Sequence, residues 1–405
     1  MNFLERLLDG VAVEWKALRD VVLPTSNIKW KDTDRIYRYI DLTSVSIETK
    51  KIAETTEITA NNAPSRAQKL VEKNDVIFAT TRPSQQRYCL IDNEYSGEVA
   101  STGYCVLRAK KDEVLPKWIL YCIASNDFKI YVEENQSGSA YPAISDTKVK
   151  DFIIPIPPLK VQAEIVRILD TFTALTAELT AELTDRKKQY NYYRDRLLSF
   201  EKGEVEWKTL GEIGQARMCK RILKSQTSSE GDIPFYKIGT FGKEPDAYIS
   251  KSLFEEYKLK YSYPKIGEIL ISASGTIGRA VIFDGEDSYF QDSNIVWIEN
   301  DESVVLNKFL FYFYQIANWG ISVGGTIQRL YNDNLRKLSI PIPYPSDPQK
   351  SLEEQARIVA ILDKFDTLTH SISEGLPREI ALRQKQYEYY RDLLLTFPKP
   401  EEVEA

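Results

Sequence analysis

The chain contains the same series of segments twice, in the same order. Three pairs of segments match, namely QAEIVRILDTF (162–172) with QARIVAILDKF (355–365), IPIPPL (154–159) with IPIPYP (340–345), and KQYNYYRDRLLSF (188–200) with KQYEYYRDLLLTF (385–397). A fourth pair, AVEWKALRD and EVEWKTLGEI, opens each half at residues 12–20 and 204–213. Chance does not supply four matches in one order, so we interpret the chain as a direct duplication.

The segments between these repeats match in pattern rather than in residues. NDVIFATTRP at 74–83 and GEILISASGT at 267–276 each predict a buried strand and a polar loop. Each is followed by a second apolar strand and a helix, which predicts an α+β domain in each half. The predicted bounds are 1–157 for the first domain, 158–203 for the first long helix, 204–350 for the second domain, and 351–405 for the second long helix and tail.

The joint between helix and domain occurs a third time, divided between the two ends of the chain. RDRLLSFEKGEVEWKTL runs across the middle of the sequence, whereas the C-terminus carries RDLLLTFPKPEEVE and the N-terminus carries LERLLDGVAVEWKAL. We therefore expect the N- and C-termini to lie side by side and to form a copy of the central joint. This arrangement predicts a pseudo-two-fold molecule.

Apolar residues at helical spacing predict one apolar stripe on each long helix. The stripes consist of Ile165, Leu169, Phe172, Leu175, Leu179 and Leu183 in the first helix, and of Ile358, Leu362, Phe365, Leu368, Ile372 and Leu376 in the second. We expect the two helices to pack antiparallel, in the manner of a coiled coil, and to separate the two domains.

The two helices differ in length by one helical turn. Phe172 and Tyr190 are 18 residues apart, whereas Phe365 and Tyr387 are 22 apart. The first helix contains the tandem repeat TAELTAEL, with Thr176, Leu179, Thr180 and Leu183 as its landmarks, and an expandable repeat suggests that its length matters. In the second helix Gly375 and Pro377 predict a kink or an interruption.

The sequence lacks the residues of the common catalytic sites. His370 is the single histidine, and the four cysteines, Cys89, Cys105, Cys122 and Cys219, form no CxxC pair. The residues that a catalytic triad or a histidine- and cysteine-based metal site requires are therefore missing. Neither a phosphate-binding GxxxxGK[ST] nor a GxGxxG motif occurs. We predict no catalytic residue and no metal site, and we interpret the cysteines as buried free thiols.

Charge and hydropathy restrict the partners and the compartment. The net charge of −6 argues against a simple polycationic nucleic-acid binder, so binding to a polyanion would require local patches or a basic partner. The sequence contains no uncharged run long enough to cross a bilayer, and we expect a cytoplasmic protein.

Polar loops after the predicted strands are the candidate recognition sites. Arg and Gln make paired hydrogen bonds to guanine and adenine edges, and glycine permits a close approach of the backbone. The candidate DNA contacts are Arg82, Gln85, Gln86 and Arg87 in the first loop, Tyr141 and Lys148 in a later one, Ser274, Thr276 and Arg279 in the second domain, and Gln328, Arg329 and Asn332 in its later loop. For each residue an ordinary solvated turn stays an open alternative.

The ends of both long helices are rich in tyrosine. The six residues are Tyr190, Tyr192, Tyr193, Tyr387, Tyr389 and Tyr390. They are more than a two-helix seam requires, so we expect some of them to face outward and to bind a partner protein.

The duplicated layout, the Q-x-x-I-V-x-I-L-D-x-F helix openings, the KQYxYYRDxLLxF helix ends and the TAEL repeat resemble the DNA specificity subunits of type I restriction-modification systems, in particular the TAEL-repeat subfamily. The resemblance covers the long helices and joints strongly and the variable domains only by position. It implies a non-catalytic subunit in which each domain reads one half of a split, asymmetric DNA sequence and the helices set the gap.

The resemblance also implies partners and their cofactors. Two methyltransferase subunits would bind along the helices and supply adenine N6 methylation with S-adenosylmethionine. Two motor-nuclease subunits, which use ATP and Mg²⁺, would join for restriction. Two other functions stay open from the residues alone: an enzyme acting by itself, either a methyltransferase or a nuclease, and a coiled-coil scaffold that binds only proteins.

Overall fold

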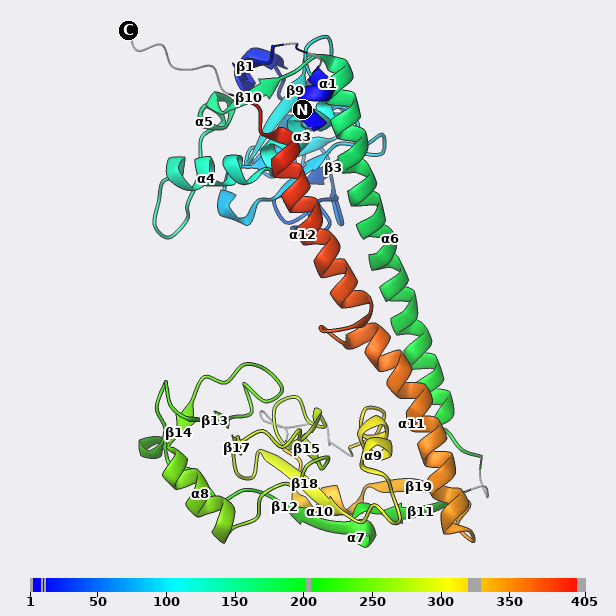
Figure 1. Cartoon of the computed structure of the whole chain (residues 1–405). Coiled ribbons are helices and arrows are strands. Elements are labelled where there is room, and N and C mark those ends of the chain that lie inside the picture. Colours follow the sequence, from blue (N-terminus) through cyan, green and yellow to red (C-terminus); the bar gives the residue numbers. More distant parts are fainter. Residues whose placement is uncertain (1–2, 9, 11, 202–204, 320–328, 399–405) are drawn as a thin grey trace. The chain divides into compact units, whose positions relative to one another are not determined.

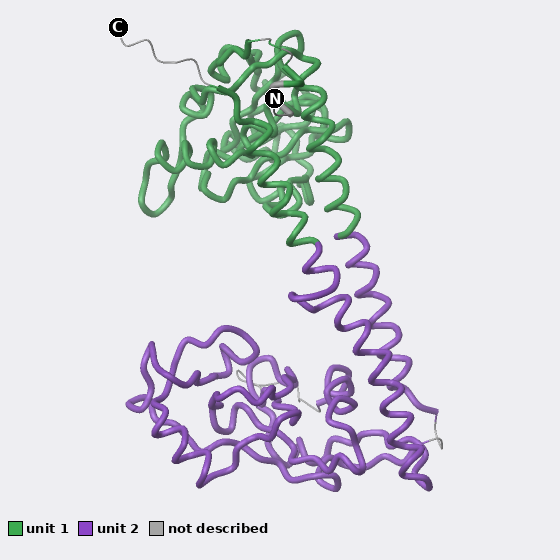
Figure 2. The backbone as a smooth tube through the Cα atoms, in the orientation of Figure 1, with its two compact units in different colours: residues 1–179, 380–405 green, residues 180–379 purple. Residues whose placement is uncertain are grey.

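The computed structural model describes residues 3–8, 10, 12–201, 205–319 and 329–398. The chain divides into two compact units by spatial contacts (Figure 2). Unit 1 comprises residues 1–179 and 380–405, and unit 2 comprises residues 180–379. Each unit thus combines one α+β domain with parts of both long helical segments, whereas the domain bounds given above remain a prediction from sequence.

The described residues of unit 1 form two four-stranded sheets and a two-stranded ribbon (Figure 1). The first sheet has the antiparallel order β2 (Val22–Leu23), β9 (Tyr104–Ala109), β6 (Val76–Ala79), β7 (Tyr88–Leu90). The second has the order β4 (Thr56–Ile58), β3 (Tyr37–Ile40), β8 (Val99–Ser101), β5 (Ala67–Leu70), with β3 and β8 parallel. The ribbon pairs β1 (Glu14–Ala17) with β10 (Ile153–Ile156).

Unit 2 repeats this order of strands, except that among its described residues the second sheet has three strands and no counterpart of β5. Its first sheet has the order β12 (Gly214–Arg217), β18 (Ile295–Asn300), β15 (Ile269–Ser272), β16 (Ala280–Ile282). Its second sheet has the order β14 (Tyr248–Ile249), β13 (Ile233–Tyr236), β17 (Tyr289–Phe290), again with one parallel pair, β13 and β17. The ribbon of β11 (Val205–Thr209) and β19 (Ser339–Pro343) completes the match, so the duplication inferred from the sequence is also a duplication of topology.

Both units also contain short helices, and several of these pack against the sheets. Unit 1 contains α1 (Phe3–Leu8), α2 (Leu18–Val21), α3 (Pro116–Ala124), α4 (Asn126–Asn135), α5 (Asp146–Asp151) and the 3-10 turns η1 (Trp30–Asp32) and η2 (Pro83–Gln85). Unit 2 contains α7 (Leu210–Ile213), α8 (Lys251–Lys260), α9 (Asn307–Tyr314), α10 (Asn332–Lys337) and η3 (Lys224–Gln226). In unit 1, Trp118 of α3 and Phe78 of β6 are fully buried in the core between helix and sheet. In unit 2, Phe309 of α9 has the same place.

Near its start, each long helical segment has a glutamine whose side chain hydrogen-bonds to the domain of the same unit. The Gln162 side chain accepts a hydrogen bond from the Leu115 N–H at 2.9 Å and donates to the Glu113 carbonyl at 3.0 Å. In unit 2, Gln355 makes the same pair of bonds with Leu306 and Val304, at 2.9 and 3.0 Å. Both glutamines are fully buried, which explains why the repeated helix motif begins with this residue.

The aspartate of each long-helix motif hydrogen-bonds to a short helix of its own domain, α3 in unit 1 and α9 in unit 2. In unit 1, Asp170 accepts hydrogen bonds from Tyr121 and Lys117, both at 2.6 Å. In unit 2, Asp363 accepts the equivalent bonds from Tyr312 and Lys308, also at 2.6 Å. Burial raises the pKa of both tyrosine hydroxyls, so each stays protonated and donates to its carboxylate.

We expect Tyr121→Phe and Tyr312→Phe each to lower the free energy of unfolding by about 1.5 kcal/mol, because each removes a hydrogen bond to a charged acceptor. The two losses should add in the double variant, since the two residues belong to different units. Urea unfolding of the four proteins measures both quantities. A single variant as stable as the wild type would show that its hydroxyl contributes nothing to stability.

The two ends of the described chain meet in unit 1. The Trp15 indole N–H of β1 donates to the Pro398 carbonyl at 3.1 Å, and the Phe397 ring packs against Trp118 at a centroid distance of 6.2 Å. Leu198 is buried in the core of unit 2, which also contains Ile340 and Ile342 of the equivalent ribbon. The predicted meeting of the termini is therefore confirmed.

The long helices are α6 (Leu159–Leu197), α11 (Pro348–His370) and α12 (Gly375–Leu395). Phe172 stacks on Tyr390 in unit 1, and Tyr193 stacks on Phe365 in unit 2, both at 5.5 Å between ring centroids. The early part of one helical segment thus meets the late part of the other at both contacts, which confirms the antiparallel pairing.

The second helical segment is interrupted, as Gly375 and Pro377 predict. α11 ends at His370 and α12 begins at Gly375, so residues 371–374 are not helical. The assignment of Ile372 to the apolar stripe is wrong, because its side chain is 85% exposed in this turn. The sequence spacing assumes a continuous helix, and the interruption removes Ile372 from it.

Candidate nucleic-acid interface

In unit 1 the two predicted recognition loops lie against each other. Thr81 forms an isolated antiparallel bridge with Ala143. The Ile144 N–H donates to the Thr80 carbonyl at 2.9 Å, and the Arg82 N–H donates to the Pro142 carbonyl at 2.7 Å. Segments that are about sixty residues apart in sequence therefore form one continuous surface at the end of β6.

Arg82 and Tyr141 are the exposed centre of this surface. The Arg82 guanidinium lies 5.5 Å from the centre of the Tyr141 ring, and the Tyr141 side chain is 71% exposed. Arg82 and Gln86 both adopt a left-handed backbone, at φ +50°, on either side of η2. Such a conformation costs a non-glycine residue about 1 kcal/mol or more and is concentrated at functional sites. The exposed Gln85 lies within the same turn.

Gln86 and Arg87 hold the loop rather than project from it. The Gln86 side-chain amide donates back to the Pro83 carbonyl at 3.2 Å. The Arg87 guanidinium donates to the Val45 carbonyl. Of the four residues predicted as contacts in this loop, the structure leaves Arg82 and Gln85 exposed to solvent and places Gln86 and Arg87 in supporting positions.

Lys50 is a further residue of this loop that the sequence does not indicate. Its ammonium donates to the Gln86 carbonyl at 2.6 Å and lies 4.6 Å from the centre of the Tyr88 ring. No motif or spacing connects Lys50 with a loop 36 residues further along the chain. Lys148 belongs to α5, where its side chain is exposed and its carbonyl accepts the Tyr131 hydroxyl at 2.9 Å.

Burial, together with the nearby charge of Arg87, lowers the pKa of Lys50 from 10.5 to about 8. The unfolded chain therefore binds more protons than the folded chain between these two values, so this residue's contribution to stability rises with pH across that range. We expect wild type to gain stability relative to Lys50→Met as the pH increases from 8 towards 10.5. Urea unfolding of both proteins across this range measures the difference, and a constant difference would contradict the lowered pKa.

Unit 2 pairs its two loops in the same way. Ser274 forms an isolated antiparallel bridge with Arg329, and the Leu330 N–H donates to the Ala273 carbonyl at 2.7 Å. Ser274 is buried and donates to the Asn294 side chain at 2.9 Å, and the exposed Arg329 donates to the same oxygen at 3.3 Å. Asn294 thus connects both loops, although no sequence pattern distinguishes it.

The other candidates of unit 2 differ in exposure. Thr276 is exposed beside Gly275, whose φ of +67° favours glycine. The Arg279 guanidinium donates to the Phe241 carbonyl at 2.9 Å, a supporting role that matches that of Arg87 in unit 1. Asn332 is half-buried at the start of α10, and Gln328 lies outside the described residues.

The tyrosines of the long helices fall into three groups. Tyr192 and Tyr389 are exposed, at 57% and 64%. Tyr193 and Tyr390 stack on phenylalanines, as described above, and keep 42% and 38% of their surface. Tyr190 is buried and donates to Gln315 at 2.7 Å, which excludes it from the exposed surface, and Tyr387 is half-buried against Tyr121.

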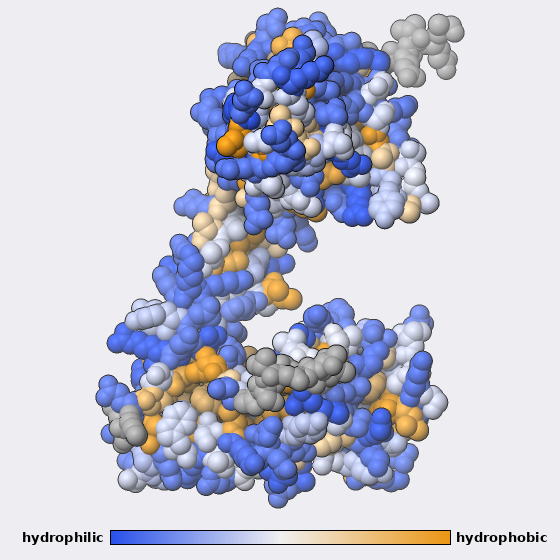
Figure 3. All heavy atoms as spheres, turned by 180° about the vertical axis from the view of Figure 1, so that it is seen from behind, coloured by the Kyte–Doolittle hydropathy of each residue, from blue (hydrophilic) through white to orange (hydrophobic). Residues whose placement is uncertain are grey.

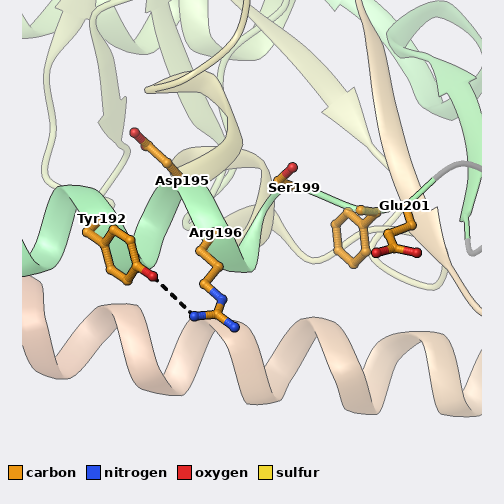
Figure 4. Close-up of a pocket in the computed structure, with 6 residues that line it drawn as sticks. Tyr192, Asp195, Arg196, Ser199 and Glu201 are labelled. Atoms are coloured by element: carbon orange, nitrogen blue, oxygen red, sulfur yellow. Dashed lines mark hydrogen bonds between the residues drawn. The ribbon is translucent and has the colours of Figure 1, made fainter.

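An open hollow lies beside the exposed tyrosine of α6. It is lined by Tyr192, Asp195, Arg196, Ser199, Phe200 and Glu201. Figure 4 shows the Arg196 guanidinium directed towards the Tyr192 hydroxyl, to which it donates at 3.1 Å. The space-filling view shows hydrophobic patches among hydrophilic residues on the long helices (Figure 3). A mixed polar and aromatic surface of this kind is typical of a protein-binding site.

The TAEL repeat lies entirely within α6. Leu179 and Leu183 are half-buried, and the Thr176 hydroxyl donates to the Phe172 carbonyl at 3.0 Å, one helical turn earlier. Thr180 is exposed. The repeat therefore continues the helix without an interruption between the rings of Phe172 and Tyr193.

The described residues form neither a metal site nor a membrane span. They contain no group of three or more His, Cys, Asp or Glu side chains that could hold a metal ion. Within the same part of the chain, no helix is both long and apolar enough to cross a membrane. All four cysteines are buried free thiols, as predicted.

A duplicated α+β domain that presents paired polar loops at equivalent strand ends defines a two-module recognition protein. The family model described as "Type I restriction modification DNA specificity domain" matches residues 13–186 and again residues 202–382. The chain belongs to this family.

Curated relatives cover the chain from end to end. A Haemophilus influenzae protein, named provisionally as a type I restriction enzyme specificity subunit, is 48% identical over 98% of both chains. The EcoR124I/EcoR124II specificity subunit of Escherichia coli is 37% identical over 100% of this chain and 99% of its own. A solved structure, reported for complex assembly and conformational transition of a type I restriction-modification system, has the same fold at a TM-score of 0.63. That chain is 23% identical, and the match covers 95% of this chain and 98% of that one.

Proposed function

We propose that this specificity subunit reads a bipartite, asymmetric DNA site, with one half read by each α+β domain. One observation carries the proposal: both domains pair the same two loops at the end of the same strand, through Thr81 with Ala143 and Ser274 with Arg329. Two equivalent sites with different side chains would read two different sequences. The chain itself is a specificity subunit and not an enzyme.

The exposed residues suit the major groove of DNA. Arg82 can form paired hydrogen bonds to guanine, and Gln85 can form them to adenine. Arg87 and Arg279 are bonded to backbone carbonyls and so fix the loops from which the exposed side chains project. A rigid loop reduces the entropy that is lost on binding, and this favours specific contacts.

Partner subunits complete the activity in this proposal. Two adenine-N6 methyltransferase subunits, which bind S-adenosylmethionine, would dock on the long helices, where Tyr192 and Tyr389 are exposed. Motor-nuclease subunits with ATP and Mg²⁺ would join them for restriction. The partners would also supply phosphate contacts that a chain of net charge −6 provides only locally. The complex would work in the cytoplasm, where it meets DNA.

Single-molecule sequencing of adenine methylation tests the proposal directly. Cells that express this chain with its methyltransferase should methylate a split motif that is absent when the methyltransferase is expressed alone. Assembly of the complex without any new motif would contradict DNA reading and favour a protein scaffold. Methylation by the purified chain with S-adenosylmethionine would contradict the non-catalytic role.

A further inference from the structure

The interruption between α11 and α12 is a defined turn. α11 ends at His370 and α12 begins at Gly375, which has a φ of +74°. A Cβ atom at Gly375 would lie only 2.4 Å from the Thr367 carbonyl oxygen. In Figure 1 the chain leaves the helical path between the two labels. Only glycine fits this position while the turn is formed.

The number of residues in this turn equals a difference between the two helical segments. Along α6, Tyr193 follows Phe172 by 21 residues, and the chain is helical throughout. Along α11 and α12, the partner of Phe172, Tyr390, follows the partner of Tyr193, Phe365, by 25 residues. The difference is four, and residues 371–374 are the four that are not helical. The turn thus takes four residues out of the helical path of α11 and α12, and α6 is four residues shorter between the same two stacked pairs.

Ile372 shows that the turn residues are suited to a helix as well. The residue continues the apolar spacing of Leu362, Phe365 and Leu368, yet its side chain is 85% exposed. The stripe residue Leu362, in the same segment, is fully buried. An isoleucine at a stripe position gains burial only when the chain between His370 and Gly375 lies along the helical path.

We propose that residues 371–374 are a spare helical turn, and hence a second determinant of the spacing between the two halves of the DNA site. The inference rests on the proposed function. One TAEL unit added to α6 would give both paths 25 residues between the stacked rings. The turn would then enter the helical path, and Ile372 would join the stripe. The present chain is thus already suited to one longer spacing, but a second added unit would find no spare turn.

Gly375 and Pro377 explain why the turn stays outside the helix in the present chain. Pro377 lies in the first turn of α12, where the missing N–H requires no partner. In a continuous helix, that missing N–H would leave the Ser373 carbonyl without its hydrogen bond. The two residues favour the turn while α6 is short, and the added length of α6 would reverse this balance.

Cysteine labelling tests the proposal on the full chain. The four native cysteines are buried, so a cysteine at an exposed position dominates the reaction with a maleimide. We expect Ile372→Cys to react roughly tenfold more slowly in a chain with one extra TAEL after Leu183 than in the present chain. Glu374→Cys, which is exposed now and would face away from the stripe, should react equally fast in both. Equal rates for Ile372→Cys in both chains would overturn the proposal.

A substitution at Gly375 gives an independent result of opposite sign in the two chains. Gly375→Ala should lower the melting temperature of the present chain, because the new Cβ collides with Thr367. In the lengthened chain the same substitution should raise it, because alanine favours a helix. A decrease of equal size in both chains would contradict the spare turn.

The labelling result is separate from the spacing of the DNA site. Protection of Ile372→Cys with an unchanged methylation gap would support the spare turn as a structural element, but it would refute both its role in setting the spacing and the helix as a ruler. A longer gap without protection would support the ruler and refute the spare turn. The two measurements therefore distinguish failure of this inference from failure of the proposed function.

Discussion

One Thr-Ala-Glu-Leu unit inserted after Leu183 is expected to lengthen the gap of the methylated DNA site by one base pair. The insertion lies inside a continuous helix, α6, and adds about 6 Å and about 40° beyond a full turn. Length alone would correspond to nearly two base pairs, since each rises about 3.4 Å. The rotation corresponds to one base pair, at about 34 to 36° each, and the reading loops must stay in phase with the groove. We therefore expect the rotation, and not the added length, to determine the new gap, which should be one base pair longer.

Methylation sequencing of cells that express the lengthened chain measures the gap. The original motif should disappear, and the same two half-sites should appear at the new distance. An insertion of two residues at the same place is the matched control. It turns the helix by about 200°, so methylation of every spacing should be lost. An unchanged gap in the lengthened chain would refute the ruler function of the helix.

The duplication made most of the fold predictable from sequence. A single copy of a recognition domain gives only a weak sequence pattern for each strand. The same pattern occurs at the equivalent position of the other copy, which strengthens the prediction. VIFA at 76–79 and ILIS at 269–272 are both fully buried central strands, β6 and β15. The repeated glutamine and aspartate of the helix motifs mark the hydrogen bonds that join helix and domain, as Gln162 and Asp170 show.

The directions of the loop side chains could not be predicted in the same way. In the sequence, Arg87 and Arg279 are arginines in polar loops after a strand, just as Arg82 is. In the structure, however, Arg87 donates to the Val45 carbonyl and Arg279 to the Phe241 carbonyl, and both carbonyls are distant in sequence. Periodicity likewise assigns Ile372 to the stripe, because the spacing of apolar residues alone does not show that residues 371–374 leave the helix. Contacts between distant segments decide both cases.

Arg82→Ala is expected to weaken binding to the half-site of unit 1 roughly 10- to 100-fold, because a paired Arg–guanine contact contributes about 1–3 kcal/mol of discrimination. Arg82 is suited to this role because it is exposed on a strained turn, and hydrogen bonds made by Lys50 and Arg87 stabilise that turn. The assembled methyltransferase complex, titrated with DNA that carries one altered half-site at a time, measures the effect. Methylation of the other half-site's adenine should fall together with it, since both halves must bind for the complex to act.

Arg82→Lys separates base reading from general attraction to DNA. Lysine keeps the charge but lacks the planar fork of the guanidinium, so the specific contact should be lost while the salt dependence of non-specific binding is kept. Arg87→Ala should instead lower the stability of unit 1, because its guanidinium holds Val45. Equal affinity of Arg82→Ala and wild type for the intact site would place Arg82 outside the interface. Loss of affinity for unrelated DNA to the same degree would show that Arg82 contacts phosphate and not a base.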